Sequence, residues 1–534
     1  MLGARARLLA RAGAARAAQA QAAQQSADAG AAAGAGRGAQ RAGRRGAAAA
    51  AARPSSERTN PPGGAGSPRE AALIALERAH GAQNYPPAPI VLERALGAAV
   101  WDVNNRRYLD FLAGYSAVSQ GHCHPKIVAA LSKQAATCTL TSRAFYNDQW
   151  PLLAAHLSET LGYDAALPMN SGAEAVETAV KLAKKWAFHS KGVPDGEARI
   201  LSACGCFHGR TSQAISMSCD PDATTGFGPL VPGQVKVPFG DAEALREAFH
   251  RHGHRMAAFV VEPVLGEGGV RLPPEGYLKT ARELCDLHNV LLVADEVQTG
   301  LGRTGHMLAI DAEGVRADVV ILGKALSGGV MPVSAVLADW SVMRAIRPGE
   351  HGSTFGGSPL ASAVALAAMR VLDDEKLVER SHTMGEGMLA RLASIAVTDA
   401  EAAEQEGRPP FVAAQRGRGL FAAVDVGGAP YVNAYDACDL LRERGVLTKP
   451  TQRDTIRLAP PLVISEEDLE HAMSQFEAVF TEDLPALYAR RTAEAEASGA
   501  EPAAHEVRLC NRCGQDLEDP TACFGTYMRN EDVL

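Results

Sequence analysis

The chain has 534 residues, of which 46% are hydrophobic and 21% charged, and its net charge is −8. Because a single hydrophobic core stops growing at about 250–300 residues, this length predicts at least two globular domains. The composition excludes a collagen-like chain, a disulfide scaffold and a fully disordered chain, since the glycines follow no triplet period and ten cysteines are too sparse.

The first 67 residues differ in composition from the rest. Residues 1–60 hold ten arginines, no lysine and two acidic residues, a charge of +8 that leaves −16 for the remainder. No aromatic residue precedes Tyr85, so this low-complexity leader cannot bury enough surface to offset its ordering entropy. The composition is typical of a transit peptide and predicts a mitochondrial matrix protein. A plastid address, or an extension without an address on a cytoplasmic protein, stays the alternative.

The rest of the chain is acidic, which argues against a nucleic-acid surface, because binding to phosphate backbones needs clustered lysine and arginine. No apolar run approaches the ~18 residues that cross a bilayer, so we expect no membrane partner.

Short apolar runs alternate with helical patterns from Asn84 onward. The runs are strand-like at residues 198–204, 256–264, 289–294, 317–322 and 332–338, and the helix-like stretches are 173–189, 276–288 and 359–372. Apolar strands separated by helices are typical of an α/β fold whose mostly parallel sheet is covered on both faces. We therefore expect a large domain over residues 121–372.

A smaller α/β domain is expected from both chain ends, residues 84–120 and 373–483. Its later part reads as helix 374–397, strand 420–426, helix 434–444, strand 455–458 and a last helix that begins at Ser465, where a capping serine precedes three acids. The polar stretch 401–410 predicts a surface loop, and the tail over residues 490–534 is expected to be disordered.

Asp295 lies at the carboxyl end of an apolar strand, where α/β sheets place ligand groups. A nucleotide hydrolase is disfavoured, because no G-x-x-x-x-G-K-[ST] motif accompanies this acid. The loop Gly300–Gly305 fits G-x-G-x-x-G and keeps a nicotinamide-dependent oxidoreductase as an alternative. Its glycines do not follow the strand directly, and no long helix opens at Gly305.

Lys324 also follows an apolar run, and it enters a glycine-rich turn. Desolvation there would lower the pKa of its amine toward the nucleophilic range, which favours a lysine that bonds to a carbonyl cofactor. Pyridoxal phosphate needs such a lysine, an acid on its pyridine nitrogen, a phosphate cradle and an apolar cover. Asp295 could be the acid, and the capping box that begins Ser171-Gly172-Ala173 could be the cradle. Phe207 could be the cover or plain core.

Two arginines suggest binding of a carboxylate substrate. Arg210 follows the flexible Gly209 and offers a planar fork for a carboxylate. Arg457 lies inside an apolar strand-like run and needs a partner if it is buried, for which Glu267 is a candidate.

These motifs resemble the fold-type I, class III pyridoxal-phosphate aminotransferases over about Asn84 to Phe480. The similar stretches are Pro168-Met-Asn-Ser-Gly-Ala-Glu-Ala, Ala294-Asp-Glu-Val-Gln-Thr-Gly, Leu322-Gly-Lys-Ala-Leu-Ser-Gly-Gly, Gly349-Glu-His-Gly-Ser-Thr-Phe-Gly-Gly and Ile456-Arg-Leu-Ala-Pro-Pro-Leu. The resemblance implies pyridoxal 5'-phosphate in the large domain and a homodimer, or a higher homo-oligomer, with shared sites. It implies that Lys324 bonds to the cofactor, that Asp295 faces the ring nitrogen and that Gln298 lies near the ring hydroxyl. Phe207 would stack on the ring. The resemblance also implies that the phosphate is held by Ser171, Gly172 and Ala173, and that Ser353 and Thr354 reach the phosphate of the partner subunit.

Within the family, Tyr85, Tyr115, Arg210, Glu267 and Arg457 resemble the members that act on ornithine. The resemblance implies that Tyr85 and Arg210 hold the α-carboxylate of ornithine, so that its δ-amine is transferred to 2-oxoglutarate. It also implies that Glu267 masks Arg457 until glutamate or 2-oxoglutarate binds. Members that act on acetylornithine or 4-aminobutyrate are the alternatives.

Two features depart from the family pattern. His208 stands where animal members have tryptophan, which leaves the cover over the cofactor open. In the tail, Cys510, Cys513, Cys523 and His505 could bind zinc, and a non-catalytic metal-binding protein is a further hypothesis, although one C-x-x-C pair is weak. For the rest of the chain we expect no metal.

Overall fold

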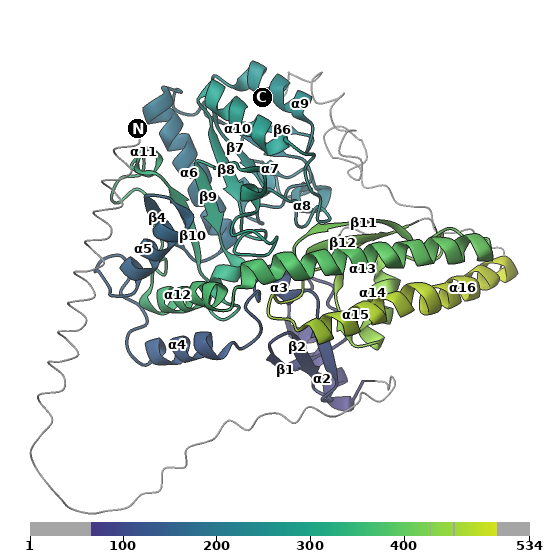
Figure 1. Cartoon of the computed structure of the whole chain (residues 1–534). Coiled ribbons are helices and arrows are strands. Elements are labelled where there is room, and N and C mark those ends of the chain that lie inside the picture. Colours follow the sequence, from purple (N-terminus) through teal and green to yellow (C-terminus); the bar gives the residue numbers. More distant parts are fainter. Residues whose placement is uncertain (1–65, 428, 452–453, 499–534) are drawn as a thin grey trace, which may run out of the picture. The chain divides into compact units, whose positions relative to one another are not determined.

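Three sheets organise the part of the chain that the structure describes (Figure 1). The computed structural model describes residues 66–427, 429–451 and 454–498. The largest sheet has seven strands in the order β4-β10-β9-β8-β7-β5-β6. Its strands are β4 (Ala165–Met169), β5 (Arg199–Ala203), β6 (Gln234–Val237), β7 (Met256–Val261), β8 (Leu291–Asp295), β9 (Val319–Leu322) and β10 (Ser334–Ala338). All neighbours run parallel except β10, which is antiparallel to β4 and β9, so the predicted mostly parallel sheet is confirmed.

Both faces of this sheet are apolar, because successive side chains of a strand point to opposite faces. In β8, Leu292 and Ala294 join a core on one face, whereas Leu291 and Val293 join a core on the other. Helix α6 (Gly172–Trp186) contributes to the second core, and helices α10 (Tyr277–His288) and α12 (Pro359–Asp374) contribute to the first (Figure 1). The central strands β7, β8 and β9 are almost entirely apolar in sequence for this reason.

The two other sheets have four strands each, and all their strands come from the segments that the sequence analysis assigned to a smaller domain. One has the order β1-β2-β3-β13 and joins β1 (Leu92–Leu96), β2 (Ala99–Asp102) and β3 (Arg107–Asp110) to β13 (Val446–Leu447). It therefore pairs an early segment of the chain with a late one. The other has the order β11-β12-β15-β14, with β11 (Val412–Arg418), β12 (Phe421–Val426), β14 (Lys449–Thr451) and β15 (Thr455–Leu458).

Some of the remaining helices begin at a capping side chain, as α7, α9 and α14 do at Thr211, Asp241 and Asn433. The remaining helices are α2 (Pro68–His80), α3 (Ala113–Ser116), α4 (Pro125–Ala135), α5 (Trp150–Leu161), α7 (Ser212–Met217), α8 (Pro221–Thr224), α9 (Ala242–His252), α11 (Trp340–Met343), α13 (Leu377–Glu406), α14 (Ala434–Glu443), α15 (Glu466–Ala478) and α16 (Leu484–Ser498), with the short π-helical segments η1 (Ala187–Lys191) and η4 (Val479–Asp483) and the 3₁₀ turns η2 (Ala309–Glu313) and η3 (Lys324–Ser327). The predicted start of the last capped helix is confirmed, since Ser465 Oγ accepts the Asp468 N–H at 3.0 Å.

Helix α13 corrects the prediction of a surface loop over residues 401–410. The helix continues to Glu406, so the prediction is wrong for residues 401–406. The buried Asp399 explains the extension, because its carboxylate accepts the backbone N–H groups of Phe411 and Val412 and pairs with Arg408 at 2.9 Å. These contacts place the turn after Glu406, where Gly407 has the left-handed φ of 68°.

Helix α16 corrects the expected start of the disordered tail. It continues to Ser498, and Arg491 within it pairs with Asp436 at 2.8 Å, so residues 490–498 are ordered by a packing contact that composition does not reveal. The rest of that tail, with its possible zinc ligands, lies outside the described residues, as does the leader up to residue 65. Among the helices of the described ranges, none combines the length and apolarity needed to span a membrane.

Candidate functional site

The site lies where neighbouring strands of the large sheet end. Glu262, Asp295 and Lys324 stand at or just beyond the carboxyl ends of β7, β8 and β9. Because these strands are parallel, their carboxyl ends meet at one edge of the sheet. The carboxylates of Glu262 and Asp295 both act electrostatically on the Lys324 amine, so the structure brings the three groups together.

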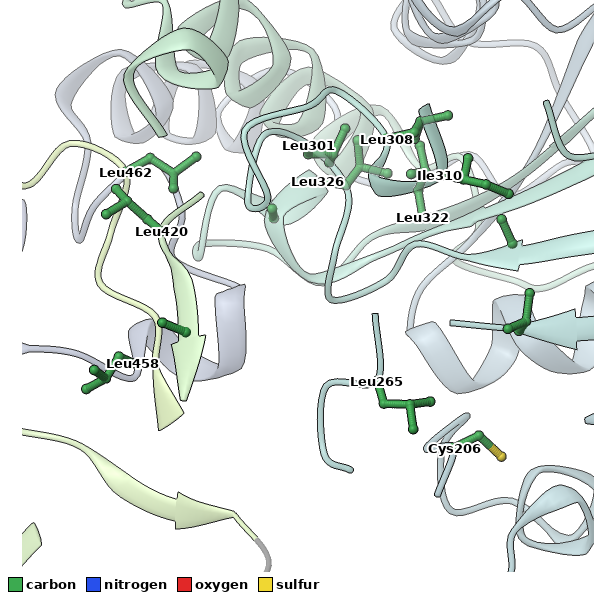
Figure 2. Packing of buried hydrophobic residues seen from close by; sticks show 14 of the residues in the cluster. Cys206, Leu265, Leu301, Leu308, Ile310, Leu322, Leu326, Leu420, Leu458 and Leu462 are labelled. Carbon is green, nitrogen blue, oxygen red and sulfur yellow. The ribbon is translucent and has the colours of Figure 1, made fainter. Parts of the chain in front are cut away.

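Lys324 begins the turn η3 and has a left-handed φ of 38°. Leu322 and Leu326, on its two sides in the sequence, gather with Leu301, Leu308 and Ile310 (Figure 2). Burial lowers the pKa of the Lys324 amine, against the opposing effect of the Glu267 carboxylate. No hydrogen bond or ion pair to another described residue holds this amine. A buried lysine whose amine is unbonded and has a lowered pKa is suited to nucleophilic attack on a carbonyl group.

Asp295 is held by His208. Its Oδ2 lies 2.7 Å from His208 Nδ1, its Oδ1 accepts the Val297 N–H at 3.1 Å, and both side chains are almost fully buried. Although burial opposes protonation of His208, the adjacent Cys206 and the hydrogen-bonded Asp295 raise its pKa well above the ordinary value. His208 therefore supports the carboxylate. The sequence showed His208 only as a departure from the family, since 87 residues separate it from Asp295.

The start of α6 presents two free backbone N–H groups. The predicted capping box is confirmed: Glu174 accepts the N–H groups of Asn170 and Ser171 at 2.8 and 2.9 Å, and Ser171 Oγ accepts the Glu174 N–H at 3.2 Å. The N–H groups of Gly172 and Ala173 are left without a partner among the described residues. At a helix N-terminus, such groups are suited to bind phosphate.

Close packing behind this helix start explains the glycine at position 172. A Cβ on Gly172 would lie 2.9 Å from Val297 Cγ1, and a Cβ on Gly323 would lie 3.5 Å from the Gly172 Cα. We therefore predict that Gly172→Ala displaces Val297 or the helix start and weakens the binding of pyridoxal phosphate by about tenfold or more. Titration of the apoprotein with the cofactor would measure this. Gly387→Ala is a suitable control, because no atom lies within 4 Å of a Cβ at that position. Equal affinity in both variants would contradict the prediction.

One buried polar atom marks the place for a ligand. Gln298 Nε2 is buried without a hydrogen-bond partner. Buried polar atoms are nearly always bonded in folded proteins, so this amide is suited to a polar ligand. With the amine of Lys324 and the free N–H groups of Gly172 and Ala173, it forms a donor set that fits pyridoxal phosphate.

Phe207 and Arg210 lie together beside this set. Phe207 is half-buried, and the Arg210 guanidinium lies 5.5 Å from the centre of its ring with the arginine exposed. Glu262, which sequence reasoning missed, accepts the Phe207 N–H at 2.8 Å and the Gly266 N–H at 3.0 Å. Only its place at a strand end could have pointed to it.

Arg457 is 1% exposed and pairs with Glu267, as expected. Its Nη1 donates to Glu267 Oε1 at 2.7 Å, and its guanidinium lies 4.7 Å from the centre of the Tyr115 ring. Although burial favours the neutral carboxyl, Arg457 holds the pKa of Glu267 below its usual range. Both residues also act electrostatically on Lys324, so the pair belongs to the same site.

The other predicted site residues lie at the margin. Tyr85 is 62% exposed and interacts electrostatically with Tyr115. Ser353 Oγ accepts a hydrogen bond from Asn170 Nδ2 at 2.7 Å, next to the start of α6. Thr354 is exposed on the same loop.

The Gly300–Gly305 loop is structural, so its interpretation as a dinucleotide-binding motif is wrong. No helix begins at Gly305; the next, η2, begins at Ala309. Arg303 is fully buried and donates to Leu420 O, Pro460 O and Ser119 Oγ at 2.9, 2.6 and 2.9 Å. The loop therefore ties distant segments together. Within the ranges that the structure describes, no group of three or more His, Cys, Asp or Glu side chains could hold a metal ion.

Comparison with known proteins agrees with this geometry. The model of the family "Aminotransferase class-III" matches residues 80–480. The mitochondrial ornithine aminotransferase of Arabidopsis thaliana is 53% identical over 447 residues, which are 83% of this chain and 91% of that protein. A structure of the Toxoplasma gondii ornithine aminotransferase, with pyridoxal phosphate at partial occupancy, is 44% identical and covers 79% of this chain and 96% of its own, with a TM-score of 0.73. The acetylornithine aminotransferase of Elizabethkingia anophelis is 45% identical and covers 77% and 99%, with a TM-score of 0.68.

Proposed function

Because the chain belongs to the class-III aminotransferases, we propose that it transfers the δ-amino group of L-ornithine to 2-oxoglutarate, giving glutamate 5-semialdehyde and glutamate. The observation that carries this proposal is the pair of buried Arg457 and half-buried Glu267 beside Lys324, with a second arginine, Arg210, left exposed. One arginine paired with a carboxylate and a second arginine open to substrate suit an enzyme that reacts first with the ω-amino group of one substrate and then forms the α-amino group of another. The names of the Arabidopsis and Toxoplasma relatives support ornithine as the substrate.

Pyridoxal phosphate is the cofactor. When bound, it supplies a carbonyl carbon that takes up an amino group and a ring that withdraws electrons from the reacting carbon. The residues that would hold it are Lys324 at the carbonyl carbon, Ser171, Gly172 and Ala173 at the phosphate, Phe207 against the ring and Gln298 near the ring hydroxyl.

Asp295 holds the proton on the ring nitrogen. A carboxylate in this buried place favours a positive charge opposite it. His208 fixes the carboxylate through its 2.7 Å hydrogen bond, and its own pKa is raised well above the ordinary value, so a positive imidazolium beside Asp295 is favoured. The pair would therefore hold a proton opposite the carboxylate.

Tyr85 and Arg210 orient ornithine. The exposed guanidinium of Arg210 binds the α-carboxylate as a planar fork, and Tyr85 closes on it from the margin. This grip turns the δ-carbon toward Lys324. Once its amine is released, Lys324 Nζ would take the proton from the δ-carbon and deliver it to the carbonyl carbon that the cofactor supplies, a role that a lowered pKa favours.

Glu267 controls which arginine binds the substrate. While it pairs with Arg457, only Arg210 is open to a carboxylate; when glutamate or 2-oxoglutarate enters, Arg457 must exchange Glu267 for the α-carboxylate. We predict that Glu267→Ala raises the glutamate-to-ornithine ratio of kcat/KM by about tenfold or more, since the masking charge is lost. Stopped-flow half-reactions with each amino acid measure this ratio. An unchanged ratio would refute the masking role.

One absorbance experiment tests the proposed function. The purified protein should show the visible band of bound pyridoxal phosphate, and ornithine should bleach that band faster than acetylornithine or 4-aminobutyrate does. Bleaching by acetylornithine or 4-aminobutyrate alone would replace ornithine as the substrate. A protein without the visible band would refute the function.

We also propose that the large domain spans residues 121–372. A homodimer with shared sites is a further part of the proposal. Two segments of the chain lie next to each other, because Asn147 Nδ2 donates a hydrogen bond to Gly357 O. Both expose large apolar side chains, which are Leu140, Phe145 and Tyr146 on the first segment and Phe355 on the second. The second segment also carries Ser353 and Thr354, whose role is to reach the partner's phosphate. Sedimentation at micromolar concentration should give the mass of a dimer or a larger multiple; a monomer would contradict the shared site.

Import into the mitochondrial matrix is supported by the arginine-rich leader and by the name of the Arabidopsis relative. Fusion of residues 1–67 to a fluorescent reporter tests it, and a plastid or cytoplasmic signal would replace it.

A further inference from the structure

Glu262 is a buried carboxylate that the proposed reaction does not use. It follows β7 directly and is 3% exposed. Its Oε1 accepts the Phe207 N–H at 2.8 Å, and its Oε2 accepts the Gly266 N–H at 3.0 Å. Each oxygen thus holds a different segment of the chain.

Both segments carry substrate-selecting residues. The first, which we call the Phe207 segment, comprises residues 207–210 and ends at the exposed Arg210. The second, which we call the Glu267 turn, comprises residues 266–269. It contains Glu267, whose carboxylate masks Arg457. A Cβ on Gly266 would lie 1.8 Å from Gln298 Oε1, so the position of this turn also sets the place of Gln298.

Two further hydrogen bonds hold the Glu267 turn in place, so the turn can stay folded when Glu262 is replaced. Thr451 Oγ1 donates to Glu267 O at 2.7 Å, and Arg416 Nε donates to Gly269 O at 2.8 Å. These contacts attach the turn to the sheet of β11 and β14. They do not involve the Phe207 segment, which Glu262 joins to the turn.

We propose that Glu262 is a positioning residue that fixes the Phe207 segment relative to the Glu267 turn and thereby sets the preference of the enzyme for ornithine over glutamate. The inference rests on the proposed function, because the open Arg210 and the masked Arg457 are taken as the two carboxylate sites. Burial raises the pKa of the Glu262 carboxyl to about 7, against the opposing effect of the two N–H donors.

Glu296 offers a matched control on the neighbouring strand. It follows β8, is 1% exposed, and has a pKa that burial also raises to about 7. Its carboxylate accepts the Ile310 N–H at 2.9 Å and the Thr299 hydroxyl, neither of which belongs to the proposed binding residues. Glu296→Gln therefore replaces an equivalent buried carboxyl group without touching either segment.

The test compares Glu262→Gln with Glu296→Gln in the cofactor-loaded enzyme. Glutamine keeps the size of the side chain, but its amide group opposes one of the two N–H donors. For Glu262→Gln we expect the ornithine-to-glutamate ratio of kcat/KM to change by about tenfold, the scale of one lost hydrogen bond to a charged group, together with a shift of the cofactor's visible band. Glu296→Gln should lower the melting temperature without changing ratio or band.

Equal ratios and band positions in both variants would overturn the inference and leave the proposed function intact. A wild-type enzyme that reacts with neither amino acid would overturn both. If Glu262→Gln does not fold, Glu262→Asp carries the same test, because it keeps the charge but is one methylene too short to hold both N–H groups. An unchanged ratio in that variant would also overturn the inference.

Discussion

Replacing Lys324 by alanine should abolish turnover, with a fall in kcat of at least about 10⁴. The amine is the group that would bond to the cofactor and move the proton at the δ-carbon, and it lies among the charges of Glu267, Arg457, Glu262 and Asp295. The loss therefore combines covalent and acid–base catalysis. The visible band of the bound cofactor should disappear or shift in the same variant, which absorbance spectroscopy measures directly.

Lys184 provides the control for this variant. Burial lowers the pKa of its amine too, but its Nζ bonds to Gln213 Oε1 at 3.1 Å on helix α6, away from the strand ends. Lys184→Ala should keep both the band and the turnover. Activity that survives in Lys324→Ala, or is lost equally in Lys184→Ala, would contradict the assignment of Lys324.

Asp295→Asn should lower kcat by about 10²–10³, the usual effect of removing one preorganised electrostatic partner. An amide keeps the hydrogen-bonding shape of the side chain but loses the charge that we propose holds the proton on the ring nitrogen. The pKa of His208 should then fall, because the carboxylate that raises it is gone. Steady-state kinetics across pH, with nuclear magnetic resonance of the histidine, would measure both effects.

Asp318→Asn is the matching control at the opposite end of the sheet. Asp318 precedes β9, where it accepts the Leu292 N–H at 2.7 Å and pairs with Arg282 at 2.8 Å. Its amide variant should lose stability and keep kcat. If Asp295→Asn retained normal kcat, the ring-nitrogen role would be refuted.

The local patterns of the sequence predicted most of this architecture. A capping box depends on residues three apart, and a strand buried on both faces reveals itself by a continuous apolar run, so the start of α6 and the strands β5, β7, β8, β9 and β10 could be placed. Strand β6 was missed, because its sequence Gln-Val-Lys-Val is not a continuous apolar run. Lys324 and Asp295 were found for the same reason, because each follows such a run.

Contacts between distant segments could not be predicted from the residues alone. The bonds from His208 to Asp295 and from Phe207 to Glu262 join residues 87 and 55 positions apart. Helix α13 likewise ends where Asp399 captures the N–H groups of the following strand, which a polar composition cannot show. The sequence context already argued against a dinucleotide-binding role for Gly300–Gly305, but only the structure reveals that the buried Arg303 ties distant segments together there.

The fate of a labelled nitrogen tests the central claim most directly. L-ornithine that carries ¹⁵N only at the δ position is incubated with the enzyme and 2-oxoglutarate, and the products are analysed by mass spectrometry. The account predicts that the label passes to glutamate, because Arg210 holds the α-carboxylate and directs the δ-carbon to Lys324. Label retained in the five-carbon product derived from ornithine would contradict the account.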